Sequence, residues 1–271
     1  MEYDEITDKY KALNRLIITL LNISEDIKGK PIQGTHSYAL MIGKKIMDHC
    51  ISVLNLSSKQ KYRIGNGEMI EFVDFPSIAV LTRSILESYL AFNHVYINTG
   101  SKEETDFKWL AYDLAGFYER QSFKATTSLS IEIKKEETET IEVMKKKMAK
   151  SPYFSTFSPK QQKQLLEKEN WKLFQHWGDL ARSAGYDPDD FNQTYKYLCS
   201  YVHSGRLCVL QILDANKHGN EINLVNANIN TCCGALAKYI IDLEKLIPST
   251  KNAYKNDPLT KAALNLWSKV V

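Results

Sequence analysis

The stretch SIAVLTRSILESYLAFNHVYIN (residues 77–98) decides the fold. It predicts a helix with apolar side chains on nearly every face, and such a helix belongs at the centre of a bundle rather than on its surface. Asp74 and Pro76 stand just before it, where an N-cap residue and a first-turn proline are favoured. We therefore expect one buried central helix with the rest of the chain packed around it.

The chain on both sides of this segment also has a helical pattern. Apolar side chains recur at three- and four-residue spacing in residues 6–27, 35–56, 101–121, 187–202 and 228–247. The 12 glycines and 7 prolines in 271 residues leave little room for the hairpins of a β-sandwich or barrel. A small hairpin at 61–73, around Gly65-Asn66-Gly67, is the best strand candidate. The prediction is an all-α protein, a single irregular multi-helix bundle that forms one domain over residues 1–271.

Residues 131–150 stand out from the other predicted helices by their charge. The segment holds six lysines and five glutamates, with a thin apolar stripe of Ile141, Met144 and Met148. Mixed charges on most of the surface predict an exposed helix, which we expect to form a charged helical protrusion. A protein partner, or a second copy of the chain in a homodimer, is the expected contact of this segment.

Composition excludes several classes of protein. The net charge of +3, from 35 basic and 32 acidic residues, is too balanced for bulk attraction to nucleic acid, membrane or acidic substrates. An uncharged apolar run of 18 residues is missing, so no membrane span is expected, and the first residues have no secretory signal pattern. Five cysteines without a C-x-x-C pair predict reduced thiols and a cytoplasmic protein, with neither a metal site nor a cofactor. P-loop, dinucleotide-binding, H-E-x-x-H and G-x-S-x-G motifs do not occur.

Three polar residues interrupt the apolar central helix. Arg83, Glu87 and His94 differ in direction by about 20–40° at roughly 100° per residue, so they share one face. The simplest interpretation is an Arg83–Glu87 ion pair within the helix, with His94 near its surface end. A charged pair inside a bundle contributes little to stability, so its presence calls for a further reason.

A second polar patch is predicted on the helix that starts at Asp187. Ser200 and His203 are three residues apart, and Tyr195 approaches the same side about one turn below Ser200. A core histidine hydrogen-bonded to a neighbouring carboxylate is the commoner interpretation. If that carboxylate is Glu87, the two patches form one site, in which Glu87 fixes the tautomer of His203 and Arg83 supplies a cation beside it.

The two polar patches carry a family resemblance. R-x-x-x-E within LTRSILESYLAFNHVY (81–96) and Y-x-x-x-x-S-x-x-H within YKYLCSYVHSG (195–205) resemble an uncharacterised bacterial all-helical family, domain of unknown function 5677, over about residues 74–205. The resemblance implies that Arg83, Glu87, Ser200 and His203 form a polar site shared by the family, and it implies no established reaction.

The arrangement is also loosely similar to HEPN-type helical ribonucleases. That likeness implies an arginine and a histidine acting on an RNA phosphate, often in bacterial defence or toxin systems. The sequence departs from their pattern, in which the histidine follows the arginine by four to six residues on one helix. Here Arg83 and His94 are eleven apart, and Arg206 and His218 are twelve apart.

Three functions follow from these observations. In the first, a metal-independent ribonuclease uses His203 as general acid or base, Glu87 to orient it and Arg83 to stabilise phosphate charge, with Tyr195 and Ser200 in the same site. RNA would then be a partner, contacted in part by the lysines of 131–150. In the second, a helical binding or scaffold protein uses the polar core to fix its helix packing. In the third, some of the 15 tyrosines and 10 phenylalanines line a pocket for a small ligand.

Overall fold

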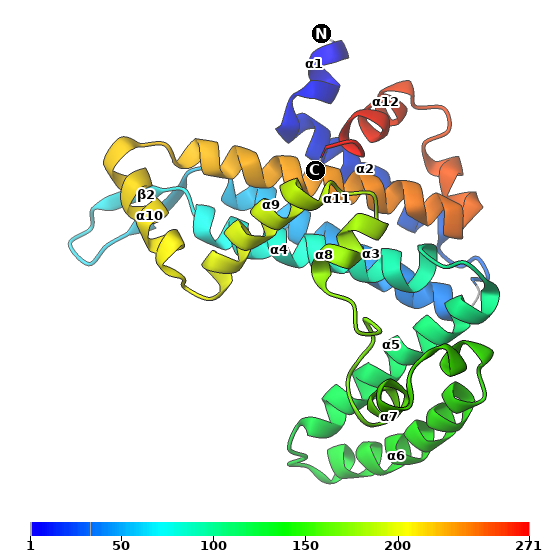
Figure 1. The fold of residues 1–271 in the computed structure, drawn as a ribbon. Helices are drawn as coiled ribbons and strands as arrows, with labels where there is room; N and C mark the ends of the chain where they lie inside the picture. Colours follow the sequence, from blue (N-terminus) through cyan, green and yellow to red (C-terminus); the bar gives the residue numbers. More distant parts are fainter. Residues whose placement is uncertain (1, 33, 271) are drawn as a thin grey trace.

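A computed structural model describes residues 2–32 and 34–270 of the chain. The structure confirms the all-α class, because helices account for the fold apart from one two-stranded hairpin (Figure 1). The α-helices are α1 (Glu2–Thr7), α2 (Lys9–Ile27), α3 (Gly34–Leu56), α4 (Phe75–Phe92), α5 (Lys102–Ser122), α6 (Ser128–Ala149), α7 (Pro159–Glu167), α8 (Trp177–Ser183), α9 (Pro188–Val202), α10 (Arg206–His218), α11 (Glu221–Leu246) and α12 (Pro258–Trp267). The short elements are a π-helical turn η1 (Asn93–Ile97), the 3-10 helices η2 (Pro152–Thr156) and η3 (Pro248–Ala253), and strands β1 (Gln60–Arg63) and β2 (Met69–Phe72).

Helix α4 is the central helix that residues 77–98 predict. The carboxylate of Asp74 accepts the Ser77 N–H at 3.2 Å and so caps its first turn, and Pro76 lies inside that turn. The helix packs against α3, α9 and α11 and buries most of its side chains. It changes to π-helical geometry at Asn93, so the α-helix ends earlier than predicted and η1 carries the chain to Ile97.

The main hydrophobic core lies where α2, α3, α4 and α11 meet. Helix α11 crosses this core over 26 residues and buries most of its length. At the crossing with α3, an added Cβ on Gly43 would lie 2.1 Å from the Tyr239 hydroxyl oxygen, so only glycine permits this close approach. The same hydroxyl donates to the Ala39 carbonyl at 3.1 Å, which satisfies its polar group inside the core.

A second hydrophobic cluster joins α5, α6, α7 and η2, which project from one side of the bundle (Figure 1). Residues 131–149 lie in α6, with Lys150 as its C-cap residue, and most of the charged side chains of this segment are exposed. The stripe of Ile141, Met144 and Met148 is buried within this cluster, so α6 is anchored on its apolar side. That all helices belong to one domain stays a prediction.

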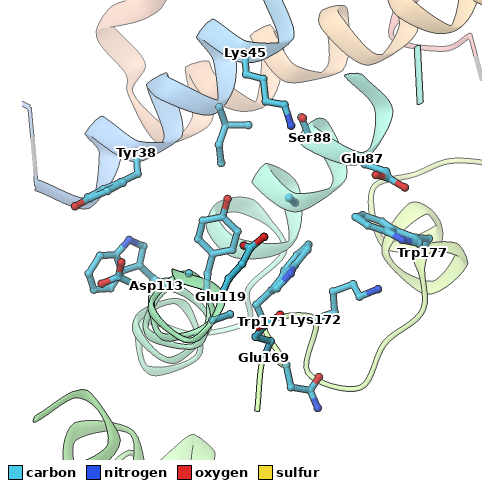
Figure 2. Close-up of a pocket in the computed structure, with 17 residues that line it drawn as sticks. Tyr38, Lys45, Glu87, Ser88, Asp113, Glu119, Glu169, Trp171, Lys172 and Trp177 are labelled. Carbon is cyan, nitrogen blue, oxygen red and sulfur yellow. The ribbon is translucent and has the colours of Figure 1, made fainter. Parts of the chain in front are cut away.

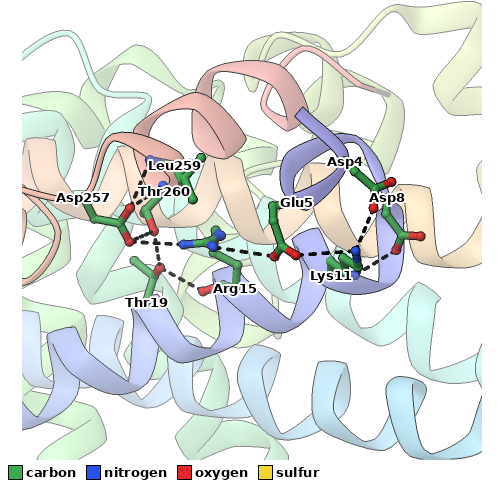
Figure 3. Close-up of polar contacts among 9 residues, drawn as sticks. All are labelled: Asp4, Glu5, Asp8, Lys11, Arg15, Thr19, Asp257, Leu259 and Thr260. Carbon is green, nitrogen blue, oxygen red and sulfur yellow. Dashed lines mark hydrogen bonds and ion pairs between the residues drawn. The ribbon is translucent and has the colours of Figure 1, made fainter. Parts of the chain in front are cut away.

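The N-terminal helix differs from the prediction of one continuous helix over residues 6–27. Asp8 starts a new helix, because its carboxylate accepts the N–H groups of Tyr10 and Lys11 at 2.9 and 3.0 Å. Ion pairs then hold α1, α2 and α12 together: Arg15 lies 3.3 Å from Asp257 and 3.8 Å from Glu5 (Figure 3).

The predicted hairpin is confirmed. Strands β1 and β2 pair antiparallel, with Lys61 opposite Glu71, and these side chains form an ion pair at 3.2 Å. The connection runs through Gly65-Asn66-Gly67, where Gly67 takes a φ of +86° that favours glycine.

Candidate functional site

The end of helix α9 decides where His203 lies. The helix ends at Val202, and the Gly205 N–H donates to the Ser200 carbonyl at 2.7 Å across the turn. Ser204 in this turn has a φ of +50°, a left-handed conformation that stops the helix. His203 is therefore the C-cap residue, exposed to solvent, and its ring reaches toward α4.

Arg83 on α4 contacts three polar side chains, those of Glu87, Tyr195 and His203. Its Nε donates to Glu87 Oε1 at 2.9 Å, one turn along the same helix. Its Nη2 donates to the Tyr195 hydroxyl at 3.3 Å, and its Nη1 lies 3.3 Å from Nε2 of His203. The Tyr195 hydroxyl in turn donates to Glu87 Oε1 at 2.6 Å, which closes a ring of contacts between α4 and α9. We call Arg83, Glu87, Tyr195 and His203 the open network.

The electrostatics of the open network favour a charged Arg83 and a protonated Tyr195. Burial opposes the charge of Arg83, but its hydrogen bond to Glu87 and the charge of that carboxylate outweigh burial, so its pKa is raised. Burial, and then the hydrogen bond to Glu87, raise the pKa of Tyr195, so the phenol keeps its proton. A guanidinium only donates, so a hydrogen bond between these two groups uses Nε2 of His203 as the acceptor.

The open network lies at the edge of the bundle and not in its core, which corrects the prediction of a buried site. The side chains of Arg83 and Glu87 are 16% and 26% exposed, and His203 is exposed. The contact between Glu87 and His203 that the sequence suggested as one interpretation is not formed. Tyr195 donates to the Glu87 carboxylate instead, and the His203 ring contacts Arg83. Helix α9 ends one residue before His203, and this end could not be located from the apolar pattern alone.

The family of the chain follows from a comparison with protein-family models. The model of a family of unknown function, DUF5677, matches residues 66–221, which is more than half of the chain. The chain belongs to the DUF5677 family. The match runs from the hairpin through α10 and includes the whole open network.

Membership of DUF5677 supplies no reaction. Neither the curated proteins nor the solved structures give a match to the chain. The similarity to HEPN-type ribonucleases is not confirmed by these comparisons, so any activity of this family member has to be argued from its own geometry.

Two residues that the sequence placed near the site lie outside the open network. The Ser200 hydroxyl donates back to the Tyr197 carbonyl of its own helix at 2.7 Å, so the geometry gives its predicted role no support. His94 lies about 16 Å from Arg83 along the helix axis, because eleven residues separate them and each adds about 1.5 Å. It is 1% exposed, contrary to the predicted position near the surface, and its Nε2 lies 3.3 Å from the Trp171 carbonyl oxygen.

Sequence reasoning missed a cavity of about 680 Å³ that has Glu87 in its wall (Figure 2). Its lining comes from α3, α4, α5 and residues 169–177, segments that share no sequence motif. Trp109, Trp171 and Trp177 all line it, which is the one compositional signal that pointed there. Tyr38 and Tyr112 also line the cavity and no phenylalanine does, so a small-ligand pocket lined by tyrosines and phenylalanines stays a prediction.

The described residues offer neither a cluster of metal ligands nor a membrane-spanning helix. Within residues 2–32 and 34–270, no group of three or more His, Cys, Asp and Glu side chains is placed to hold a metal ion. No helix in the same ranges has the length and hydropathy needed to cross a membrane.

Proposed function

We propose that this DUF5677 protein is a metal-independent ribonuclease that cleaves RNA phosphodiesters at the open network. The observation that carries the proposal is the 3.3 Å contact between a fixed guanidinium and an exposed imidazole. An exposed imidazole can exchange protons with a substrate, and a fixed guanidinium matches phosphate oxygens. These are the two groups that phosphodiester transfer needs when no metal supplies the positive charge.

The proposed reaction is an internal transesterification. The 2′-hydroxyl oxygen bonds to the neighbouring phosphorus while the bond from phosphorus to the 5′-oxygen breaks. The products are a 2′,3′-cyclic phosphate and a free 5′-hydroxyl. His203 takes the proton of the attacking 2′-hydroxyl and returns it to solvent, and solvent supplies the proton of the leaving 5′-oxygen, so no other reactant is required.

Arg83 couples substrate binding to activation of His203. In the structure, Nη1 of Arg83 occupies the lone pair of His203 Nε2. A phosphate that accepts from Nη1 releases this lone pair, and Nε2 becomes free to act as the base. Glu87 and Tyr195 hold the other side of the guanidinium through Nε and Nη2, so they act as positioning residues.

The lysines of α6 contribute less to RNA binding in this proposal. Lys134 donates to the Gln121 carbonyl at 2.8 Å and Lys145 to Glu142 at 2.8 Å, so part of this charge is already neutralised or engaged. The similarity to HEPN-type ribonucleases suggests a defence or toxin role in the bacterial cytoplasm, and we adopt it as an analogy of reaction class only.

The test is degradation of mixed-sequence RNA oligonucleotides in excess EDTA. We expect wild-type protein to release fragments with 2′,3′-cyclic phosphate ends, and His203→Ala to be about 10²–10⁴-fold slower. His218→Ala is the matched control, because His218 is also exposed. It lies at the C-terminal end of α10, where its ring contacts Asp214 one turn earlier on the same helix. Equal rates for wild type and His203→Ala, or no cleavage by wild type, would overturn the proposal.

A scaffold function is the second candidate, and one observation favours it. The contacts of Tyr195 with Arg83 and Glu87 tie α9 to α4, which fixes how these helices pack. In this case the exposed charged face of α6 recruits a protein partner or a second copy of the chain. Loss of the open network would then change stability alone.

A further inference from the structure

The cavity beside the open network is lined by aromatic rings. Trp171 lies 5.5 Å from Tyr112 and 5.9 Å from Trp177 between ring centroids, and Tyr38 lies 6.3 Å from Trp109. Figure 2 shows Tyr38 on one side of the space, Trp171 near its middle and Trp177 on the opposite side. Rings on opposite walls suit a planar ligand, because stacking on aromatic side chains stabilises any nucleobase by about 1–3 kcal/mol.

Carboxylates determine which ligand fits between these rings. Glu87, Asp113, Glu119 and Glu169 line the cavity, against the two lysines Lys45 and Lys172. One of these lysines is engaged, since Lys172 Nζ lies 4.6 Å from the centroid of the Trp177 ring. The excess of carboxylates repels phosphate, and carboxylate oxygens accept hydrogen bonds from the exocyclic amino groups of nucleobases.

The cavity and the open network meet at Glu87. Its carboxylate lines the cavity and also accepts from Arg83 and Tyr195. The Tyr195 ring, which belongs to the open network, lies 6.3 Å from the Trp177 ring of the cavity. Glu87 therefore links the cation of Arg83 to the acidic, aromatic lining of the cavity.

We propose that the cavity binds the base next to the cleaved phosphate and prefers bases that carry an amino group, adenine, cytosine or guanine, over uracil. The inference rests on the ribonuclease function proposed above and assigns its base preference. The phosphate lies at Arg83 because the cavity excludes it, while the ring stacks on the tryptophans and its amino group donates to the carboxylates. Uracil has no amino group, and its one base donor, N3–H, lies between two carbonyl oxygens that the carboxylates repel, so it gains less beyond stacking than the other three bases.

Tryptophan fluorescence tests the binding step without any cleavage. Three of the four tryptophans of the chain line the cavity, so a stacked base changes the signal. The probes are adenosine, cytidine, guanosine and uridine, which carry no phosphate. We expect saturable quenching by the first three at concentrations at least about 10-fold lower than for uridine, and Trp171→Ala to weaken binding by about 5- to 150-fold, the equivalent of about 1–3 kcal/mol.

Two further variants make the result specific. Glu119→Gln changes an exposed cavity carboxylate, and we expect it to weaken adenosine, cytidine and guanosine several-fold and uridine much less. If Trp171→Ala does not fold, Glu119→Gln still tests whether the cavity binds the base. Tyr62→Ala removes an exposed aromatic ring on the hairpin, 62% exposed and outside the cavity, and should leave all four titrations unchanged.

The outcomes separate this inference from the proposed function. Nucleoside binding with the expected preference, but without RNA cleavage, supports the cavity as a base site and overturns the ribonuclease. Cleavage at all four bases with equal rates, or no quenching by any nucleoside, overturns the base preference and leaves the ribonuclease to its own test. Quenching by uridine at the same concentrations as by adenosine also overturns it.

Discussion

Helix α4 carries two polar networks that differ in what surrounds them. In the first, the closed network, the Tyr89 hydroxyl and the Asn93 amide of α4 and η1 donate to Oδ2 of Asp242 on α11, at 3.0 and 2.9 Å. Lys245 donates to the other carboxylate oxygen at 2.7 Å, and Tyr89, Asn93 and Asp242 are all buried. In the second, the open network, Arg83 and Glu87 are partly exposed and His203 is exposed.

The difference shows what each network is able to do. Both carboxylate oxygens of Asp242 accept from side chains within the protein, and although this network also lines a cavity of about 410 Å³, it holds no exposed imidazole beside an arginine. The open network leaves an imidazole in solvent and a carboxylate in the wall of a cavity. A partly exposed ion pair contributes little to stability, so the open network gains little by holding helices together. We therefore assign the closed network to the fold and the open network to function.

The largest effect on stability is expected for Asp242→Ala. This change leaves two buried donors without an acceptor, and each such group costs about 1–3 kcal/mol, so we expect a loss of about 2–6 kcal/mol in the free energy of unfolding. Urea denaturation measures it. Asp48→Ala is the control, since Asp48 pairs with Lys44 at the surface with side chains 50% and 60% exposed, and should cost well under about 1 kcal/mol. Equal costs for both variants would contradict the assignment of the closed network to the fold.

A smaller effect on the free energy of unfolding is expected from protonation of His94, a buried residue of η1 that directly follows α4. Burial lowers its pKa from the ordinary 6.5 to about 4, and its Nδ1 has no hydrogen-bond partner among the described residues. The unfolded chain therefore binds more protons than the folded protein between pH 4 and 6.5, and stability falls as the pH is lowered through this window. The slope approaches about 1.4 kcal/mol per pH unit.

Comparison of two histidine variants checks this prediction. We expect His94→Gln to remove most of that slope in denaturation measurements at pH 4.5, 5.5 and 6.5, whereas His203→Ala keeps it. A wild-type slope that survives in His94→Gln would mean that His94 is not the group responsible.

The smallest change in stability is expected for Tyr195→Phe. The ring keeps its stacking on Phe191, at 5.3 Å between centroids, and only the hydroxyl contacts with Glu87 and Arg83 are lost. Because these contacts are partly exposed, we expect a cost of about 1 kcal/mol. Tyr62→Phe on the exposed hairpin should cost nothing measurable. A loss for Tyr195→Phe as large as for Asp242→Ala would show that the open network is structural after all.

Much of the fold could be predicted from the sequence, because local signals decide it. The apolar faces of residues 77–98 place α4 at the centre, and Asp74-Phe75-Pro76 marks its start. The i, i+4 spacing of Arg83 and Glu87 gives their ion pair directly, since residues four apart are neighbours on a helix. The sequence also suggested that this ion pair lies near Tyr195 and His203, because both polar patches belong to helices that are expected to pack together.

The remaining features depend on tertiary structure and leave no local pattern. The exposure of His203 depends on the turn at Ser204 and Gly205, which ends α9 before the histidine. Asp242 finds Tyr89 and Asn93 only because α11 crosses α4. The cavity combines residues of four segments, so nothing in any one of them indicates it.

The most direct test of this account removes the charges of the open network and follows two quantities at once. The double variant Arg83→Met, Glu87→Leu replaces the ion pair with apolar side chains of similar size. We predict that RNA cleavage in EDTA falls by at least about 10²-fold while the free energy of unfolding falls by only about 1 kcal/mol, as for Tyr195→Phe. Cleavage at the wild-type rate together with a changed unfolding free energy would contradict the account and make the open network part of a scaffold.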